Sequence, residues 1–394
     1  MHIEELRACH LKIPLRKPIR HASFTRTTND TLIVRCKLND GTVGWGEGLP
    51  RPYVTGETID STFEQLNTTN LKKQLDGNFV DTNSALELLR NFELQQTRTD
   101  VRDCFGNAAR CALELSVLDA ATRSEGIPLS KVSELFSEAV TVCEPRTRVQ
   151  YSTVLTSMSS IQSTVKAILY RLYGFAQCKI KVGTEGIDDG KLLRKSRRYL
   201  GSKMDIRIDA NEAWQPEEVA QKIEPLLPCG ISSLEQPVPH DEVEKLAELK
   251  PKLSVPMMLD ESLCSLGDGK RAIALGLCDL FNIRLSKCGG FLNSLLLAAM
   301  AKKHGLGYQL GCQVGESGIL SAAGRHFACS VGGIRFLEGS FDRYLVKEPL
   351  TEEDLTFGKG GWAKTIEKPG LGVTVDEEAM ERLKIRECHW KIFG

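Results

Sequence analysis

The 394-residue sequence lacks several features that would place it outside the ordinary globular proteins. It has no excess charge of either sign, because 51 Lys and Arg balance 51 Asp and Glu. A neutral chain has no general electrostatic attraction for nucleic acid or for an anionic membrane. No apolar run approaches the roughly 20 residues that a membrane-spanning helix needs, and the N-terminus has no signal-peptide core. We therefore expect neither a nucleic-acid nor a membrane partner.

Paired cysteine motifs are also absent, although the sequence has 13 cysteines. No two of them form the Cys-x-x-Cys pair that is typical of zinc cages and redox sites. An odd and scattered set does not indicate a disulfide framework either. We interpret the cysteines as reduced side chains that fill small apolar positions, and we expect a cytoplasmic location.

The N-terminal part of the sequence predicts strands followed by helices. Residues 31–38 and 42–47 are strand-like and flank Asn39-Asp40-Gly41, a strong hairpin turn. From 61 to 122 the apolar residues recur at helical spacing. The pattern predicts an α+β domain over residues 1–125.

From about residue 149 the sequence alternates between strand and helix patterns. Eight apolar strand candidates follow one another at a spacing of roughly 25 residues, namely 149–155, 177–182, 205–211, 231–238, 256–262, 280–290, 306–315 and 334–342. A doubly wound sheet has the same alternation, but it would show a glycine fingerprint after its first strand, which is missing here. We predict a (β/α)8 barrel over 126–350, with residues 351–394 packing back onto the first domain.

Ionisable residues occur at or near the C-terminal ends of five predicted strands, where the active sites of barrels lie. Strands of a parallel barrel should be almost wholly apolar. Asp209, Glu235 and Asp260 end three consecutive strands, about 4.8 Å apart, so their carboxylates can converge on one ion. Hard oxygen ligands suit Mg²⁺. The alternative is salt bridging to barrel lysines or arginines without a metal.

Three lysines lie on two of the same strands. Lys179 and Lys181 are two residues apart and share a face, although such a pair also occurs on solvated strand edges. Neighbouring ammonium groups disfavour each other's charge, which lowers a lysine pKa toward the range of a general base. Lys287 lies on the predicted sixth strand, across the barrel. We predict that two bases flank a central substrate carbon.

Taken together, these residues resemble the muconate lactonizing enzyme subgroup of the enolase superfamily. The matching motifs are KIKVG, RIDAN, LEQPV, LDES and RLSKCGG, and the likeness extends over nearly the whole chain. The resemblance implies a set of roles that we list together: Mg²⁺ held by Asp209, Glu235 and Asp260, an acid/base pair of Lys181 and Lys287, Lys179 tuning Lys181, Asn211 and Glu261 beside the metal, and a strand-seven carboxylate at Glu316.

Two further segments look like loops of dipeptide epimerases. Residues 51–58 (RPYVTGET) resemble their capping-domain loop, with Tyr53 as a candidate substrate contact. Residues 18–28 (PIRHASFTRTT) resemble the mobile loop that closes over the substrate, where Arg20 or Arg26 could bind a second substrate anion. Those enzymes hold the substrate ammonium with an Asp-x-Asp pair after strand eight. Here Glu338 is a single candidate for that position.

The implied activity is abstraction of the proton beside a substrate carboxylate through an enediolate. We expect an isomerase that racemises or epimerises an amino-acid or dipeptide-like substrate. A muconate-type cycloisomerase and a carboxylate lyase stay open as alternatives. A non-catalytic binding protein is a remote alternative, because no expected metal ligand or lysine is missing. The expected partner is a small-molecule carboxylate, and a homo-oligomer is compatible with the sequence.

Overall fold

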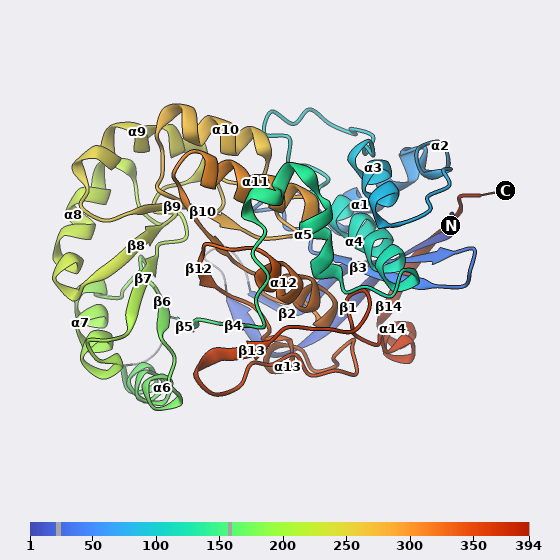
Figure 1. The fold of residues 1–394 in the computed structure, drawn as a ribbon. Coiled ribbons are helices and arrows are strands. Elements are labelled where there is room, and N and C mark those ends of the chain that lie inside the picture. The colour runs from blue at the N-terminus through green and yellow to red at the C-terminus, as the bar shows by residue number, and fades with distance from the viewer. Residues whose placement is uncertain (21–24, 157–159, 394) are drawn as a thin grey trace.

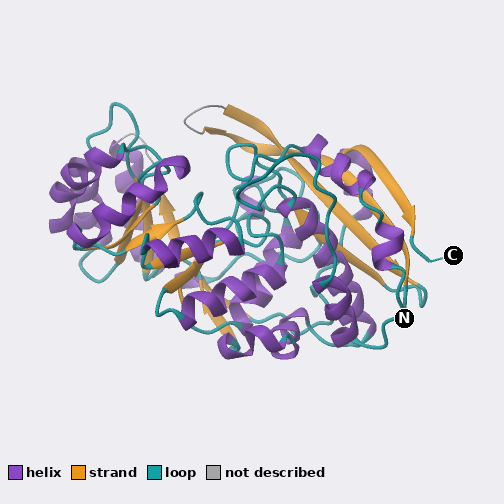
Figure 2. Cartoon of the chain, turned by 90° about the horizontal axis from the view of Figure 1, so that it is seen from above, coloured by secondary structure: helices purple, strands orange, loops and turns teal. Residues whose placement is uncertain are grey.

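A computed structural model, which describes residues 1–20, 25–156 and 160–393, has two parts. A barrel lies on the left of Figure 1, and a strand-rich domain lies on the right. From above, the barrel strands are surrounded by helices, whereas the other domain carries long strands on its outer side (Figure 2). Both chain termini lie together on the side of that domain away from the barrel. Within the described ranges, no helix is long and apolar enough to cross a membrane.

Eight parallel strands form the barrel and follow each other in chain order. They are β5 (Thr153–Leu155), β6 (Gln177–Lys181), β7 (Asp205–Asp209), β8 (Ile231–Glu235), β9 (Met257–Leu259), β10 (Leu280–Ile283), β11 (Gly307–Leu310) and β12 (Ile334–Leu337). The first and last strands meet where the Ser152 N–H donates to the Leu337 carbonyl at 2.8 Å. The predicted (β/α)8 architecture is confirmed.

Helices connect the barrel strands on the outside. They are α6 (Ser160–Tyr173), α7 (Asp189–Leu200), α8 (Val219–Ile223), α9 (Leu246–Leu249), α10 (Leu266–Leu275), α11 (Phe291–Lys303), α12 (Gly318–Ser330) and α13 (Asp342–Leu345). The 3₁₀ helices are η1 (Leu129–Lys131), η2 (Ser137–Val142), η3 (Pro216–Glu218), η4 (Glu224–Cys229), η5 (His240–Lys245), η6 (Lys250–Lys252) and η7 (Lys359–Gly361).

All eight barrel strands are shorter than the sequence pattern suggested, and in two of them the difference changes where residues lie. The segment 149–155 is split, because β4 (Arg148–Gln150) pairs with β13 (Trp362–Lys364) outside the barrel. The segment 280–290 ends its strand at Ile283, so Lys287 lies in the following turn and not on the strand. Gly289 and Gly290 there have φ of 83° and 113°, a backbone region that turns the chain toward α11 and that favours glycine.

An antiparallel sheet in the order β14-β1-β2-β3 builds the other domain. Its strands are β1 (Ile3–Arg20), β2 (Thr25–Leu38), β3 (Val43–Gly48) and β14 (Lys384–Lys391). Its helices are α1 (Ile59–Thr68), α2 (Leu71–Leu75), α3 (Thr82–Arg90), α4 (Asn107–Ser124), α5 (Val132–Leu135) and α14 (Glu377–Leu383). Because β14 pairs with β1, the C-terminal segment completes this capping domain as predicted. The domain limits at 125 and 350 stay a prediction.

Strand β3 lies directly against the backbone of the buried helix α4. Its glycines are two residues apart, a repeat of about 6.8 Å on a strand, close to the roughly 6.0 Å of four helical residues. A Cβ built on Gly46 would lie 2.0 Å from the Ala112 carbonyl oxygen, and one on Gly48 would lie 2.0 Å from that of Ala108. The glycine-rich segment 44–48 is therefore a packing device between strand and helix.

Buried carboxylates of the capping domain bind the N-termini of two barrel helices. Glu47 on β3 accepts hydrogen bonds from the Ser317 and Leu320 N–H groups at the start of α12, both at 3.0 Å. Glu114 on α4 accepts from the first two N–H groups of α11, at 2.6 and 3.0 Å. Helix N-termini leave N–H groups unpaired and favour negative charge. Burial raises the pKa of Glu114 to about 7. These contacts fix the capping domain against the barrel.

Candidate active site

Three carboxylates lie side by side at the C-terminal end of the barrel strands. Asp209 ends β7, Glu235 ends β8, and Asp260 directly follows β9. Asp209 and Glu235 are register partners, and all three side chains belong to residues at most 1% exposed. Asp209 Oδ2 and Glu235 Oε2 have no hydrogen-bond partner. A buried carboxylate oxygen without a hydrogen bond is costly, so these oxygens favour positive charge beside them, which Asp209 Oδ2 has in Lys179 Nζ at 3.3 Å.

The electrostatics of the cluster are uneven. Burial, and then the charge of Asp209, raises the pKa of Glu235 to about 8. Burial also opposes ionisation of Asp260, but Arg284 and Lys287 overcome it and hold the pKa of Asp260 below its ordinary value. Asp260 Oδ1 lies 2.9 Å from Lys287 Nζ, and Arg284 forms an ion pair with Oδ2. Arg284 and Lys287 thus favour the charged form of Asp260, whereas burial and the neighbouring Asp209 make Glu235 the harder of the two to ionise.

Lys179 lies deep in the barrel among carboxylates. Its ammonium is 3.3 Å from Asp209, 3.4 Å from Glu235 and 2.9 Å from Glu338. Burial alone would lower the pKa of Lys179, but these charges raise it well above the ordinary value. The proximity of Lys179 and Lys181 suggests a lowered lysine pKa. At Lys179 the surrounding carboxylates have the opposite effect. Its position fits a fixed positive charge.

Lys181 and Lys287 lie on opposite sides of the barrel. Lys181 ends β6 and Lys287 follows β10, and these strands are four places apart in a ring of eight. Lys181 Nζ is half-buried and donates to Asn211 Oδ1 at 2.5 Å. Lys287 Nζ is buried and donates to the Asp260 carbonyl at 2.6 Å and to the Asn282 carbonyl at 2.8 Å. Two lysine side chains thus lie on opposite sides of the carboxylate cluster.

The backbone after β7 and β8 is strained. Asn211, Glu212 and Gln236 have φ of 44°, 64° and 34°, in the left-handed region that costs non-glycine residues on the order of 1–3 kcal/mol. In this conformation the Asn211 side chain lies between two expected site residues. Its Oδ1 accepts from Lys181, and its Nδ2 donates to Glu261 at 3.4 Å. Burial, and then Asp260, raises the pKa of Glu261 well above its ordinary value.

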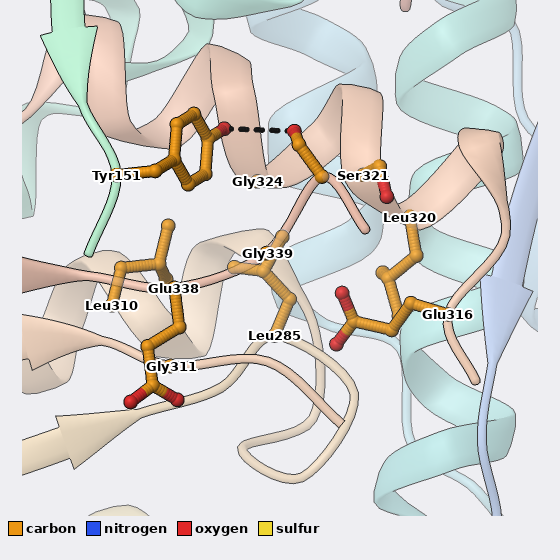
Figure 3. Close-up of a pocket in the computed structure, with 11 residues that line it drawn as sticks. Tyr151, Leu285, Leu310, Gly311, Glu316, Leu320, Ser321, Gly324, Glu338 and Gly339 are labelled. Carbon is orange, nitrogen blue, oxygen red and sulfur yellow. Dashed lines mark hydrogen bonds between the residues drawn. The ribbon is translucent and has the colours of Figure 1, made fainter. Parts of the chain in front are cut away.

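Glu338 is buried in the barrel interior, and its carboxylate already binds two cations. Oε1 accepts from Arg207 at 2.5 Å and lies 2.9 Å from Lys179 Nζ. Burial opposes ionisation, but these two cations overcome it and lower the pKa of Glu338 far below its ordinary value. Figure 3 shows Glu338 and Glu316 on two sides of a small pocket, which the Tyr151–Ser340 hydrogen bond of 3.1 Å closes at one end.

Two buried or partly buried arginines lie at the edge of the barrel beside Glu316. Arg26 donates to the Val314 carbonyl at 2.6 Å, and Arg51 donates to Asn29 at 2.5 Å. Burial, and then Arg26, lowers the pKa of Arg51 to about 10. Burial raises the pKa of Glu316 to about 8. Tyr53 is close enough to interact electrostatically with both arginines.

The expected mobile loop is only partly described. Residues 21–24 and the Arg20 side chain lie outside the described residues, whereas Arg26 is the loop residue that reaches Val314.

Three residues of the site were missed from the sequence. Asn282 on β10 donates to Glu235 Oε1 at 2.7 Å, Arg284 pairs with Asp260, and Arg207 on β7 pairs with Glu338. The signal was available, because each is a polar residue in or just after a strand that should be apolar.

The donor set fits Mg²⁺ by its chemistry. Three hard oxygen ligands come from three neighbouring strands, and two of their oxygens lack hydrogen bonds. In the described part of the chain, no three His, Cys, Asp or Glu side chains are arranged to enclose a metal ion. Lys179 and Arg284 instead neutralise the carboxylates in this conformation. The chemistry of the three donors fits a metal site here, and Glu235 Oε2 has no hydrogen bond in this conformation.

Two family models cover most of the chain. Residues 3–132 match the N-terminal domain of mandelate racemase / muconate lactonizing enzyme, and residues 163–379 match the enolase C-terminal domain-like family. The chain belongs to this family. The expected membership in the enolase superfamily is confirmed, and the motifs that carry the site all lie inside the second match.

Relatives within the mandelate racemase / muconate lactonizing enzyme family span almost the full chain. An N-succinyl-L-Arg/Lys racemase of Bacillus cereus is 26% identical in sequence, and the alignment covers 98% of each chain. The crystal structure of an N-succinyl Arg/Lys racemase from the same organism superposes with a TM-score of 0.85 at 25% identity, covering 99% of this chain and 100% of that one. An L-Ala-D/L-Glu epimerase of Bacillus subtilis is 28% identical over 95% of this chain and 97% of its own.

A third relative belongs to the cycloisomerase branch. The muconate cycloisomerase 1 of Rhodococcus opacus is 27% identical, with 94% of this chain and 95% of its own covered. All three relatives are isomerases by name. The expectation of an isomerase of this superfamily is confirmed at the level of the family, and the relatives leave racemisation, epimerisation and cycloisomerisation to be distinguished.

Proposed function

We propose that this protein racemises or epimerises an amino-acid derivative or dipeptide-like substrate by moving the proton on the carbon beside its carboxylate. The observation that carries the proposal is the placement of Lys181 and Lys287 on opposite sides of the Asp209–Glu235–Asp260 cluster. Inversion at a carbon needs one group to remove the proton and another to deliver one to the opposite face. Relatives that are named racemases and epimerases support this choice.

We propose that Asp209, Glu235 and Asp260 hold Mg²⁺, the metal used by members of this family. When bound, Mg²⁺ supplies positive charge that stabilises the negative charge developing on the substrate carboxylate. The chain's own residues do the rest. Lys181 is oriented by Asn211, and Lys287 is oriented by the carbonyls of Asp260 and Asn282. Lys179 stays charged and fixes the Asp209 and Glu235 side chains.

The test is α-proton exchange in D₂O, followed by NMR, on a library of dipeptides and N-substituted amino acids. We expect exchange that needs a divalent cation and that stops in excess chelator. Glu235→Gln should abolish metal-supported exchange with the fold intact, because it removes a central oxygen charge of the cluster. Circular dichroism and a melting curve check the fold. Full activity in excess chelator would refute the metal assignment.

We propose that the substrate carries a nitrogen near its carboxylate and that Glu338 faces this nitrogen. A buried carboxylate opposite an ammonium or amide contributes roughly 1.5–3 kcal/mol through a charge-assisted hydrogen bond. A substrate nitrogen would have to share Glu338 with Lys179 and Arg207, which already bind it. The capping-loop motif at residues 51–58, which resembles that of the epimerases, supports an amino-acid-type substrate.

A second candidate, a muconate-type cycloisomerase, is favoured by a different observation. Arg26 and Arg51 lie beside one another, and their hydrogen bonds go to neutral oxygens. Their charge suits a second substrate anion, and the Rhodococcus opacus relative is a muconate cycloisomerase. Without a substrate nitrogen, Glu338 would serve only to neutralise Lys179 and Arg207.

One comparison separates the two candidates. Glu338→Gln should lower kcat/KM for amino-acid-type substrates about tenfold to a hundredfold and leave nitrogen-free dicarboxylates unchanged. An equal loss for both classes would assign Glu338 to the Lys179–Arg207 network alone. If the unmodified protein turns over only nitrogen-free acids, the cycloisomerase replaces our proposal.

A further inference from the structure

Helix α6 presents large apolar side chains to solvent. Of the fifteen exposed large apolar side chains in the described chain, six belong to this helix. They are Ile161 (74% exposed), Val165 (50%), Ile168 (39%), Leu169 (55%), Leu172 (72%) and Tyr173 (42%). Single exposed apolar residues are normal on protein surfaces, but a contiguous set marks an interaction site. In Figure 1 the helix lies at the lower edge of the barrel, far from the capping domain.

On α6 the large apolar side chains face solvent, and small side chains face the barrel. The face on the barrel has the small side chains Ser163 and Ala167, at 5% and 1% exposed. Tyr170 anchors that face, because its hydroxyl donates to the Val154 carbonyl at 3.2 Å. A barrel helix normally buries its larger apolar residues. Since α6 does not, its outer face is built for something other than the packing of this barrel.

The spacing of the outer residues identifies a helical partner. Ile161, Val165, Ile168 and Leu172 are separated by four, three and four residues. This is the repeat of the apolar seam along which two helices pack side by side. Leu169 widens the stripe on one side. A flat or extended partner would not require the repeat.

We propose that this seam is the contact between two copies of the chain, with α6 of one copy packed antiparallel against α6 of the other across a two-fold axis. In a two-fold contact the same patch on both copies must be self-complementary, and an apolar seam meets that condition. An antiparallel pair that crosses at the middle of the helix places Ile168 against Val165 of the second copy, and Leu172 against Ile161.

Charge selects the antiparallel arrangement. The helix has two charged residues, Lys166 and Arg171, and no acidic one. Parallel packing would set each cation beside its own counterpart, which is unfavourable. The antiparallel arrangement sets Arg171 against Gln162 of the second copy instead.

The available area is sufficient for a specific contact. With about 150 Å² for a fully exposed side chain, the lower end of the aromatic range, the six residues expose roughly 500 Å² per copy. Two copies would bury roughly 1,000 Å², the least that a specific interface needs.

The experiment measures the molar mass of the full chain by light scattering and by sedimentation at micromolar concentration. We expect twice the chain mass of 43.6 kDa. Ile168→Glu and Val165→Lys should each give the single-chain mass, because a charge is then buried in an apolar seam. Val101→Glu is the matched control, since Val101 is 95% exposed on the capping domain and should leave the dimer intact. Melting curves check that each variant folds.

The decisive sample is a mixture of the two seam variants. If Ile168 faces Val165 of the other copy, the Glu and Lys side chains pair across the axis, and the mixture regains the dimer mass that neither variant has alone. A single-chain mass for the unmodified protein would overturn the proposal, as would a dimer that the seam variants leave unchanged. A mixture that stays monomeric would overturn the antiparallel register.

Discussion

Lys179 shows how strongly neighbours decide the behaviour of one residue. Two adjacent lysines suggest mutual repulsion and a lowered pKa. In the folded chain three carboxylates surround Lys179, so its pKa is raised instead. The three carboxylates therefore favour the charged form of Lys179, which fits a fixed positive charge beside the acidic cluster. Lys287 has a raised pKa too, because Asp260 outweighs the effect of burial, and we propose that Lys181 and Lys287 carry the proton transfer.

Lys181 and Lys287 predict that each single variant acts on a different enantiomer of the substrate. We expect Lys287→Ala to exchange the α-proton of one enantiomer without inverting it, because Lys181 still removes that proton and nothing delivers one to the other face. Lys181→Ala should show the mirror preference. Exchange into each enantiomer is followed by NMR in D₂O, with Lys303→Ala on the outer helix α11 as the control. Equal residual exchange of both enantiomers in each variant would contradict the two-base assignment.

The polarity of strand ends was readable from the sequence, but the pairing of side chains was not. An ionisable residue in an apolar barrel strand costs free energy, so Asp209, Glu235 and Asp260 stood out. Arg207 breaks the same rule in the middle of β7, and its partner Glu338 directly follows β12, far away in sequence. Which residues face each other across a barrel depends on strand tilt and stagger, which local patterns do not encode.

At the scale of elements, the packing of β3 on α4 gives a stability prediction. Gly46→Ala should destabilise the protein by about 3 kcal/mol, because the new methyl carbon would lie 2.0 Å from the Ala112 carbonyl oxygen. Gly77→Ala is the matched control, since its Cβ would meet only the Leu88 side chain at 3.5 Å. Urea unfolding of both variants measures the difference. Equal stabilities would show that β3 can move away from α4.

The spacing of apolar residues predicts the order of the strands and helices, but it does not predict the residues at which they begin and end. Eight strand candidates correspond to β5 to β12, and the apolar run at 108–121 lies within α4. The split of 149–155 was not foreseen, because β4 is a strand only through its partner β13, which lies more than 200 residues later. Residues 284–290 look strand-like by composition but form a turn, since two glycines with positive φ redirect the chain.

At the scale of the whole molecule, one buried histidine joins three separate parts. His326 lies on α12 of the barrel, its Nδ1 accepts from the Ser130 N–H at 3.2 Å, and its Nε2 donates to the Leu371 carbonyl at 3.1 Å. Burial lowers the pKa of His326 to about 4. The neutral ring therefore holds the barrel, the linking 3₁₀ turn η1 and the C-terminal segment together.

This histidine predicts acid sensitivity. The unfolded chain has a histidine pKa near 6.5, so between pH 6.5 and about 4 it binds a proton that the folded chain excludes. Stability from His326 is present above pH 6.5 and is lost as the pH falls toward 4, by about 2 kcal/mol between pH 7 and pH 5. Urea unfolding at both pH values should show this difference and lose it in His326→Gln. Substitution of the exposed His304 by Gln should leave it unchanged.

The pairing of β14 with β1 has a consequence for synthesis on the ribosome. Residues 3–20 emerge long before their edge partner, residues 384–391. At a translation rate of about 5–20 residues per second, the β1 edge waits roughly 20–70 s for its partner. An unpaired edge is a template for pairing with other chains. The capping-domain sheet is therefore completed only after the barrel has been made, and the β1 edge needs shielding until then.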